Sequence, residues 1–447
     1  MDGGVYGHRV RFSLASVTFV GAMSGPAAAP PVTRKREFWV LVGYAVALGV
    51  SGAFTALVSL GIIKFGGRWS TGFRPGWFGG HWWWVAVTAA AGVVVGLLRR
   101  VTRLPEEVPG FFEDLKAEHF DTRLVPGTTA VSAVSLIGGA SVGPEKVLAS
   151  TGAGAGSWLA RRRGLGDEDS QVNTMAGIAG IFGGVFSSPV IVVMLILEVA
   201  RPGGQRFSKT LVTDIVAGSI SFGIYFAIAG AVFLGVYQVP PYTFRAWQLL
   251  AGIPLGLFAA LVATLTTGLI MLASRLFSRV KIPAIAKSAL GGMMFGIVGV
   301  ALPLTMFSGG DQLASVLKGT GTLGLGLCIA ILIGKMLTCA VSQGSGFVGG
   351  PIFPALFIGG TAGVVVHQAI PGVPLGLAFA CLLPAVLGSL VEAPFAMVLL
   401  AAFMTRVGAL QAPPILIAVV TAFLGVAGVK YFLASRTQAR PRQRPRP

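Results

Sequence analysis

The stretch VGPEKVLASTGAGAG at residues 142–156 returns 207 residues later as GGPIFPALFIGGTAG at residues 349–363. In both copies a Gly-Pro pair leads into an apolar run, and two later glycines fall in register. The matching glycines are Gly152 and Gly156 in the first copy, and Gly359 and Gly363 in the second. The shared pattern predicts that each stretch is a helix entered through Gly-Pro, because proline is preorganised for a first helical turn.

A second pair of matching stretches follows in the same order. SPVIVVMLILEVAR at residues 188–201 corresponds to APFAMVLLAAFMTR at residues 393–406, and each places an arginine twelve residues after its proline. Two matches at nearly the same offset indicate an internal duplication of about 200 residues. Chance similarity between Gly- and Pro-rich apolar segments is the alternative. Duplicated membrane domains with interrupted helices are typical of transporters.

The composition places the whole chain in a membrane. Of its 447 residues 54% are hydrophobic and 11% are charged, whereas soluble domains carry about 25% charged residues. Apolar stretches run almost without a break from residue 38 to residue 433, and several, such as 171–199 and 374–405, exceed the roughly 20 residues of one crossing. We therefore predict an all-α polytopic membrane protein built from tilted and broken helices, in two repeats of inverted topology.

Charge sets the predicted orientation and the boundaries. The net charge is +18, and the basic residues cluster in short segments between the apolar stretches. Positive loops mark the cytoplasmic side, so we expect a multi-pass cell-membrane protein with both termini in the cytoplasm. Nucleic acid is not an expected partner, because no soluble domain remains to bind it. The predicted organisation is a leader at 1–33 (with Met1 or Met23 as the start), repeat halves at 34–236 and 237–434, and a basic tail at 435–447.

Several classes of chemistry find no support in the sequence. The cysteines Cys328, Cys339 and Cys381 stand in apolar surroundings and show no metal-binding spacing. The four histidines are scattered, and no nucleophile–base pair or phosphate loop appears. We expect neither an enzyme nor a bound metal or cofactor. Acids at membrane depth are functional by default, and only Glu198, Asp214, Asp311 and Glu392 follow Asp169.

The two Gly-Pro helix starts predict an anion site. A helix N-terminus presents unpaired N–H groups and the positive end of the helix dipole. Two such ends facing each other would hold an anion without a formal cation, which suits an ion that must also leave. The alternative is that the pairs are plain helix starts. The residues nearest the predicted site are Val142, Gly143, Glu145, Gly350, Ile352 and Phe353.

At these residues the chain resembles the CLC family of chloride channels and chloride/proton exchangers, of the prokaryotic type without CBS domains. Three segments correspond in order and spacing to the family signatures: PEEVP at 105–109, ASVGP at 140–144 and SGFVGGPIFP at 345–354. Framework segments also fit, namely VPPY at 239–242, ALGG at 289–292 and EAP at 392–394. The resemblance implies a homodimer with one anion path in each subunit, lined by helix N-termini, a serine hydroxyl and a tyrosine hydroxyl.

The departures from the family pattern bear on mechanism. Val142 stands where the family has its external gating glutamate, and Val199 where exchangers have their internal proton-transfer glutamate. Glu106 and Glu107 replace the central serine and are expected to face the cytoplasmic vestibule or to act as a displaced gate. Tyr431 is the candidate for the pore hydroxyl, with an interfacial anchor as the alternative.

We therefore expect passive, channel-like permeation of small monovalent anions, chloride first. The predicted anion pathway comprises Glu106, Ser141, Val142, Gly143, Gly350, Ile352, Phe353 and Tyr431, with Val142 at the gate. A chloride/proton or fluoride/proton exchanger remains open, with Glu145 as a displaced gate or Glu198, beside Val199, as the internal acid. A membrane scaffold that transports nothing is the alternative of another class. Glu198 is otherwise expected to cap or pack at a helix end.

Overall fold

The computed structural model describes residues 36–72, 82–117 and 120–438. The predicted leader at 1–33 lies outside these residues, as do residues 439–447 of the predicted tail, while residues 435–438 continue the last helix. The described part of the chain is helical and contains no strand. The first-half helices are α1 (Arg36–Gly72), α2 (Trp83–Val101), α3 (Phe111–Ala117), α4 (Val125–Ile137), α5 (Glu145–Arg162), α6 (Asp167–Val185), α7 (Pro189–Ala200) and α8 (Gly204–Ala229). The second-half helices are α9 (Trp247–Arg279), α10 (Ala284–Ala301), α11 (Gly310–Lys318), α12 (Leu325–Gly344), α13 (Ile352–Ala369), α14 (Leu375–Val391), α15 (Pro394–Thr405) and α16 (Ala412–Gln438).

Eight of these helices are long and apolar enough to cross a membrane. Their outward faces carry large apolar side chains such as Phe54, Leu257 and Leu424, each more than half exposed. In water such a surface would aggregate, whereas lipid tails solvate it. The prediction of an all-α polytopic membrane protein is confirmed.

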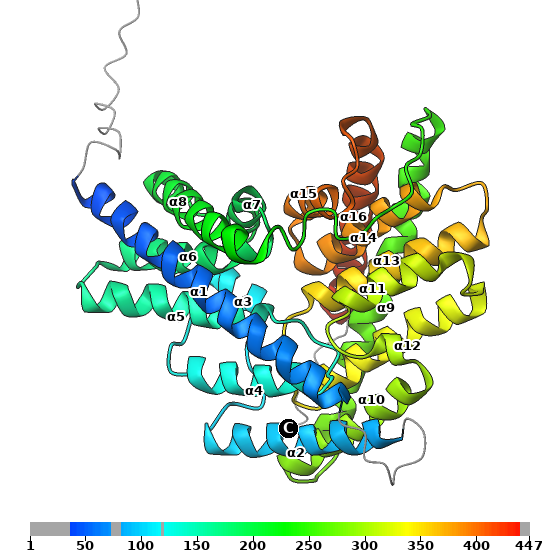
Figure 1. Cartoon of the computed structure of the whole chain (residues 1–447), viewed down its shortest axis with the longest axis horizontal. Coiled ribbons are helices and arrows are strands. Elements are labelled where there is room, and N and C mark those ends of the chain that lie inside the picture. Colours follow the sequence, from blue (N-terminus) through cyan, green and yellow to red (C-terminus); the bar gives the residue numbers. More distant parts are fainter. Residues whose placement is uncertain (1–35, 73–81, 118–119, 439–447) are drawn as a thin grey trace, which may run out of the picture.

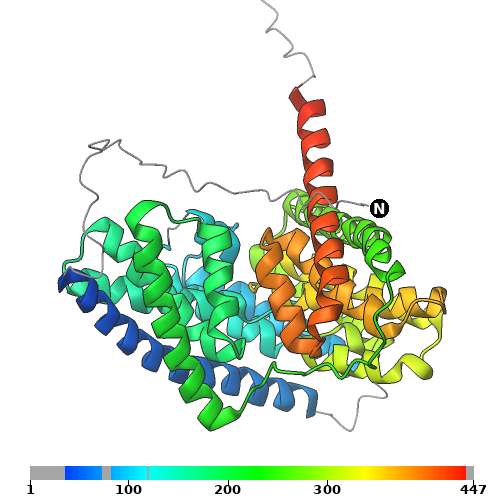
Figure 2. The ribbon, with the colours of Figure 1, turned by 90° about the horizontal axis from the view of Figure 1, so that it is seen from above.

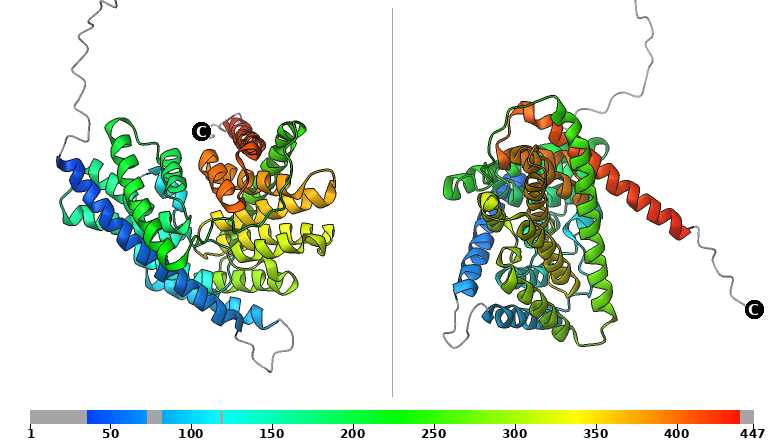
Figure 3. Two further views of the ribbon diagram at one scale, coloured as in Figure 1. Left: turned by 45° about the horizontal axis from the view of Figure 1, so that its top comes forward. Right: turned by 90° about the vertical axis from the view of Figure 1, so that its right-hand side faces the viewer.

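The two halves of the chain form two lobes that meet in the middle of the molecule. In Figure 1 the first half, blue to green, lies on the left, and most of the second half, yellow-green to red, lies on the right. The lobes meet where α7 packs against α15. Helix α2 is an exception, because it packs along α10 of the other half. Helix α16 projects from the body at its carboxyl end, as Figures 2 and 3 show.

The two overlong apolar stretches are each broken into two helices at matching places. The first breaks between α6 and α7 at Ser187, and the second between α14 and α15 at Glu392. Both residues have positive φ, 55° and 60°, a left-handed conformation that ends a helix. A proline then opens the next helix in each half. Residues 171–199 and 374–405 therefore each form a long helix followed by a short one.

The short helices α7 and α15 show that the repeat is structural and inverted. Each has twelve residues, and each ends at an arginine in the left-handed conformation, Arg201 (φ 51°) and Arg406 (φ 53°). The Glu198 side chain, near the C-terminal end of α7, contacts the N-terminal end of α15. The end of one helix thus lies beside the start of its counterpart, so the equivalent helices run in opposite directions.

The repeated glycines serve the same purpose in both halves. A side chain at Gly152 would strike the backbone of Gly177 on α6, and one at Gly359 would strike the backbone of Leu382 on α14. Helices α5 and α13, each eighteen residues long, can therefore pack closely on the helix that follows them. This packing fixes the starts of α5 and α13, which carry the candidate site.

Candidate anion site

A two-residue bridge joins the starts of α5 and α13. Gly143 and Gly350 exchange both backbone hydrogen bonds, each 2.8 Å from N–H to carbonyl oxygen. Pro144 and Pro351 follow as the N-caps of α5 and α13. Two segments 207 residues apart are thereby held in register, and two positive helix ends meet at the boundary between the halves.

The carboxylate of Glu145 lies at this bridge. Glu145 is the first residue of α5 and is fully buried. Its Oε1 accepts a hydrogen bond of 2.8 Å from the N–H of Phe353, in the first turn of α13. A carboxylate thus occupies the start of α13, which is where a bound anion would be stabilised.

Two glycines make room for this carboxylate. A methyl group built on Gly143 or on Gly350 would overlap the Glu145 side chain. The second oxygen, Oε2, has no hydrogen-bond partner within the described ranges. Because burying an anion without full hydrogen bonding is costly, the carboxylate is held less firmly than a structural cap would be.

The other predicted pathway residues around the bridge are buried as well. Val142 has no exposed surface, and its side chain lies beside Gly349. Ser141 receives support from the second half, since its N–H donates to Ser342 Oγ at 3.1 Å, while its own Oγ is buried without a partner in the described chain. Ile352 is fully buried and Phe353 is 8% exposed. The structure therefore gathers Ser141 to Glu145 and Gly350 to Phe353 in one place.

A chain of aromatic rings leads from α3 to this place. The ring centroids of Phe111 and Phe182 are 5.5 Å apart, those of Phe182 and Phe186 are 5.2 Å apart, and Phe186 lies 6.2 Å from Phe233. Phe233 then contacts Phe353 edge-on at 5.5 Å. No sequence pattern links these rings, because they come from four separated segments.

Glu106 and Glu107 are exposed in the loop between α2 and α3. Arg99 fixes this loop: its guanidinium donates to the carbonyl oxygens of Pro105 at 2.6 Å and Glu106 at 2.7 Å, and to Gly346 at 2.8 Å. The loop is thereby tied to the segment that leads into α13. Both glutamates are exposed, whereas the cluster around Glu145 is buried.

Tyr431 does not belong to the buried cluster. It lies near the end of α16 with 78% of its surface exposed. A different tyrosine is buried: Tyr237, in the connection between the halves, has 2% exposure, and its ring meets Phe379 edge-on at 5.5 Å. The Tyr237 hydroxyl donates to the Gly310 carbonyl at 3.4 Å. Its only sequence signal was its position two residues before the VPPY segment.

Glu198 and Val199 differ in their surroundings. Both oxygens of Glu198 are used, since they accept hydrogen bonds from the N–H groups of Phe395 at 3.0 Å and Ala396 at 2.7 Å. Glu198 therefore caps α15. Val199 is 6% exposed within the apolar core.

A buried lysine supports the bridge from the second half. Lys335 of α12 is fully buried, and its Nζ donates to the carbonyl oxygens of Thr305 at 3.1 Å and Phe307 at 2.6 Å. The N–H of Phe307 in turn donates to Gly139 at 3.0 Å, four residues before Gly143. The signal that could have revealed Lys335 was its isolation within the apolar stretch 320–341.

In the described chain all three cysteines are buried and free, and no cluster of metal-ligating side chains occurs.

Known proteins match this chain along most of its length. The family described as voltage gated chloride channel matches residues 90–426. The putative ion-transport protein YfeO of Salmonella choleraesuis (strain SC-B67) is 26% identical over 307 residues, covering 66% of this chain and 72% of the relative. The YfeO protein of Salmonella newport (strain SL254) matches over the same shares.

Solved structures share the fold. The crystal structure of a slow cyanobacterial Cl⁻/H⁺ antiporter superposes with a TM-score of 0.77 at 17% identity, covering 90% of this chain and 99% of that one. A CLC-type fluoride/proton antiporter gives a TM-score of 0.72 at 19% identity, covering 87% and 95%. The repeat, the bridged helix starts and these matches agree: this chain is a membrane protein of the voltage-gated chloride channel (CLC) family of anion transporters.

Proposed function

We propose that this protein carries small monovalent anions, chloride first, across the cell membrane, and that the Glu145 carboxylate is the gate of the anion path. The observation that carries the proposal is the hydrogen bond from the Phe353 N–H to Glu145 Oε1. The donors at the start of α13 are the groups that would hold an anion, and a carboxylate of this chain occupies them.

Repulsion between the Glu145 carboxylate and an arriving anion would let Glu145 act as a gate. A carboxylate and a second anion repel each other strongly at close range in a low-dielectric interior. An anion can therefore occupy the start of α13 only when the carboxylate is protonated or has swung away. Backbone N–H groups hold the arriving ion without a formal positive charge, so it can also leave.

This position of Glu145 changes the expected mechanism. The expectation of a passive channel rested on the absence of a carboxylate at Val142 and at Val199. Glu145 brings a carboxylate to the anion site from three residues further along the chain. We therefore favour proton-dependent transport over an ungated pore, and the names of the antiporters with the same fold are consistent with this choice.

The proposal includes the arrangement in the membrane. We place the basic helix ends, such as Arg161 to Arg163 of α5, in the cytoplasm together with both termini. We also propose a homodimer in the lipid bilayer, with one anion path in each subunit. Exposed apolar residues on the central helices, including Val190 of α7 and Phe395 of α15, would then meet the partner subunit or lipid.

The test is anion efflux from liposomes that hold the purified protein, measured from pH 5 to pH 8. In the wild type we expect chloride efflux to fall by about tenfold per pH unit on the alkaline side of the Glu145 titration. Glu145→Gln should transport at every pH as fast as the wild type does in acid. Glu37→Gln, at an exposed position at the start of α1, is the matched control.

Three outcomes would contradict the proposal. A Glu145→Gln protein with the wild-type pH response would remove Glu145 from the gate. A wild-type chloride efflux rate that does not depend on pH would favour the passive channel. Absence of both chloride and fluoride flux in the wild type would favour a scaffold. Fluoride flux without chloride flux would show that fluoride is the transported anion and would leave the proposed role of Glu145 unchanged.

A further inference from the structure

Asp214 is a second buried carboxylate that the gate does not use. It lies in α8, ten residues after the helix begins, and has no exposed surface. Neither of its carboxylate oxygens has a hydrogen-bond partner in the described part of the chain. An acid at membrane depth is costly, and it is rarely kept without a partner unless it has a function.

The helices around Asp214 offer it no counter-ion at its own depth. Helix α8 packs against α1, α6 and α7, and α8 itself has no charged residue after Asp214. The charged and titratable groups of these four helices are Arg36, Glu37, Tyr44, Lys64 and Arg68 of α1, Asp167, Glu168 and Asp169 of α6, Glu198 of α7, and Arg206, Lys209 and Tyr225 of α8. Of the acids and bases on α6 and α8, all but Asp214 stand at the helix ends.

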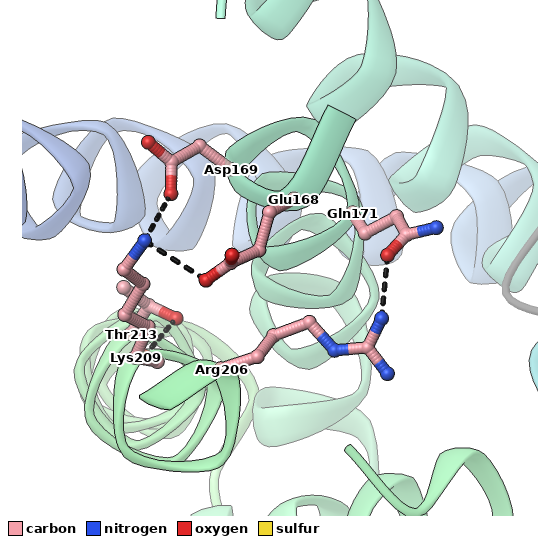
Figure 4. A network of polar contacts seen from close by, with 6 residues as sticks. All are labelled: Glu168, Asp169, Gln171, Arg206, Lys209 and Thr213. Carbon is pink, nitrogen blue, oxygen red and sulfur yellow. Dashed lines mark hydrogen bonds and ion pairs between the residues drawn. The ribbon is translucent and has the colours of Figure 1, made fainter. Parts of the chain in front are cut away.

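Those end groups are engaged with one another. Lys209 Nζ binds Glu168 at 3.0 Å and Asp169 at 2.7 Å, and Arg206 donates to the side chain of Gln171 at 2.6 Å (Figure 4). This network ties the starts of α6 and α8 together and leaves Asp214, five residues further into α8 than Lys209, without a cation.

A pocket leads from the surface toward Asp214. An open pocket of about 380 Å³ is lined by Glu168, Gln171, Gly203, Gln205 and Arg206. A narrow cleft shares Gln171 and Arg206 with it and continues inward to Met175 and Thr210. Thr210 and Asp214 are four residues apart on α8 and therefore lie on one helix face, so the cleft ends one turn short of the carboxylate.

The same cleft borders the C-terminal end of α7. Ala200 and Pro202 line the cleft, and Val199 directly precedes Ala200. Helix α6 packs against both α8 and α5, so a single helix separates the element of Asp214 from the element of Glu145.

We propose that Asp214 is the internal proton-binding group of this transporter. A proton from water at the Lys209 end of α8 would pass along the cleft lined by Thr210 and bind a carboxylate oxygen of Asp214. It would then pass to the Glu145 carboxylate and leave from there to water on the other side of the membrane. The inference rests on the proposed gating by Glu145. It adds that transport is anion/proton exchange, with the proton entering through α8 rather than through α7.

The experiment measures chloride efflux and proton uptake together in liposomes under a chloride gradient, with the full-length protein. The wild type should take up protons against their gradient. Asp214→Asn should keep the chloride flux and its dependence on pH, because Glu145 is intact, while proton uptake falls at least tenfold. Asp311→Asn, an exposed acid on α11, should behave as the wild type.

Two features guard against a merely structural effect. Asparagine matches aspartate in shape and carries no charge, so Asp214→Asn should melt no lower than the wild type. Asp214→Glu restores a carboxylate and should recover part of the proton uptake, which a packing role would not predict. Each variant is checked by thermal melting before transport is measured.

The outcomes separate this inference from the proposed function. Wild-type proton uptake in Asp214→Asn, or no proton uptake in the wild type, would overturn the role of Asp214. The role of Glu145 would stand in both cases if Glu145→Gln still abolished the pH dependence of chloride efflux. Loss of chloride flux in a folded Asp214→Asn protein would also overturn the inference, because the anion path would then depend on Asp214.

Discussion

Two glutamates of the first half reach across to helix starts of the second half, but their environments differ. Glu198 uses both oxygens to cap α15 and is partly exposed. Glu145 uses one oxygen on α13, is fully buried, and leaves Oε2 without a partner in the described chain. The same contact between a carboxylate and a helix start is thus fully satisfied in one place and half satisfied in the other.

The comparison teaches how to tell a structural carboxylate from a mobile one. A satisfied cap at a partly exposed helix end stabilises the fold at little desolvation cost. A buried and half-satisfied carboxylate stores an unfavourable desolvation energy that protonation or movement can release. On this criterion Glu198 holds the two halves together, and Glu145 is free to respond to protons and anions.

The largest expected effect comes from filling the space that Glu145 occupies. Gly350→Ala would place a methyl group on the carboxylate. The backbone at Gly350 does not have positive φ, so alanine can keep the bridge to Gly143. We expect the displaced carboxylate to stop gating, which brings the ratio of chloride efflux at pH 5 to that at pH 8 from well over tenfold to near one.

Gly61→Ala on α1, where nothing lies near an added methyl group, is the control for this substitution. Efflux from both variants is measured in the same liposome preparation. If Gly350→Ala retained the full pH response, the carboxylate would not need the space beside the bridge, and the contrast with Glu198 would lose its main support.

An intermediate effect is expected at Glu198. Glu198→Ala leaves two N–H groups of α15 without their cap, which should lower the free energy of unfolding by about 1–2 kcal/mol. The pH response of chloride efflux should not change. Thermal unfolding in detergent tests the loss of stability, and chloride efflux at pH 5 and pH 8 tests the pH response. Glu37→Gln again serves as the control. A weaker pH response of chloride efflux in Glu198→Ala would indicate that Glu198 takes part in proton transfer.

The smallest effect is expected at Glu392, a third glutamate, which lies between α14 and α15. Hydrogen bonds from Lys116 at 2.5 Å and Lys430 at 2.7 Å lower the pKa of the Glu392 carboxyl from its ordinary value to about 2. A lowered pKa stabilises the fold above the ordinary value, and this contribution is lost as pH falls toward 2. Unfolding of Glu392→Gln should therefore depend less on pH between about 4.5 and 2.

Melting temperatures of the wild type and Glu392→Gln across this pH window measure the effect. The two curves should converge at the acid end, because the wild-type carboxyl is then protonated and neutral like glutamine. Curves that run parallel throughout the window would show that the two lysines contribute nothing through Glu392. Because these side chains are largely exposed, salt should also weaken the difference.

The sequence by itself determined the class of fold and its internal repeat. Hydrophobic length, scarce charge and the Gly-Pro helix starts are local features, and local features fix which segments become membrane helices. The equal spacing of Pro189 to Arg201 and of Pro394 to Arg406 indicated the duplication, and in the structure each pair bounds a helix of twelve residues. Where an apolar stretch was too long for one crossing, the helix broke two residues before the repeated proline.

The tertiary structure alone decided which side chain lies at the start of α13, where we propose the anion site. In sequence Val142 stands at the family's gate position, yet its side chain turns toward Gly349, while Glu145 reaches the start of α13. The direction of a side chain at a helix start depends on where the helix begins and on what faces it. Here the bridge between Gly143 and Gly350 sets both, through hydrogen bonds between segments 207 residues apart that no local pattern encodes.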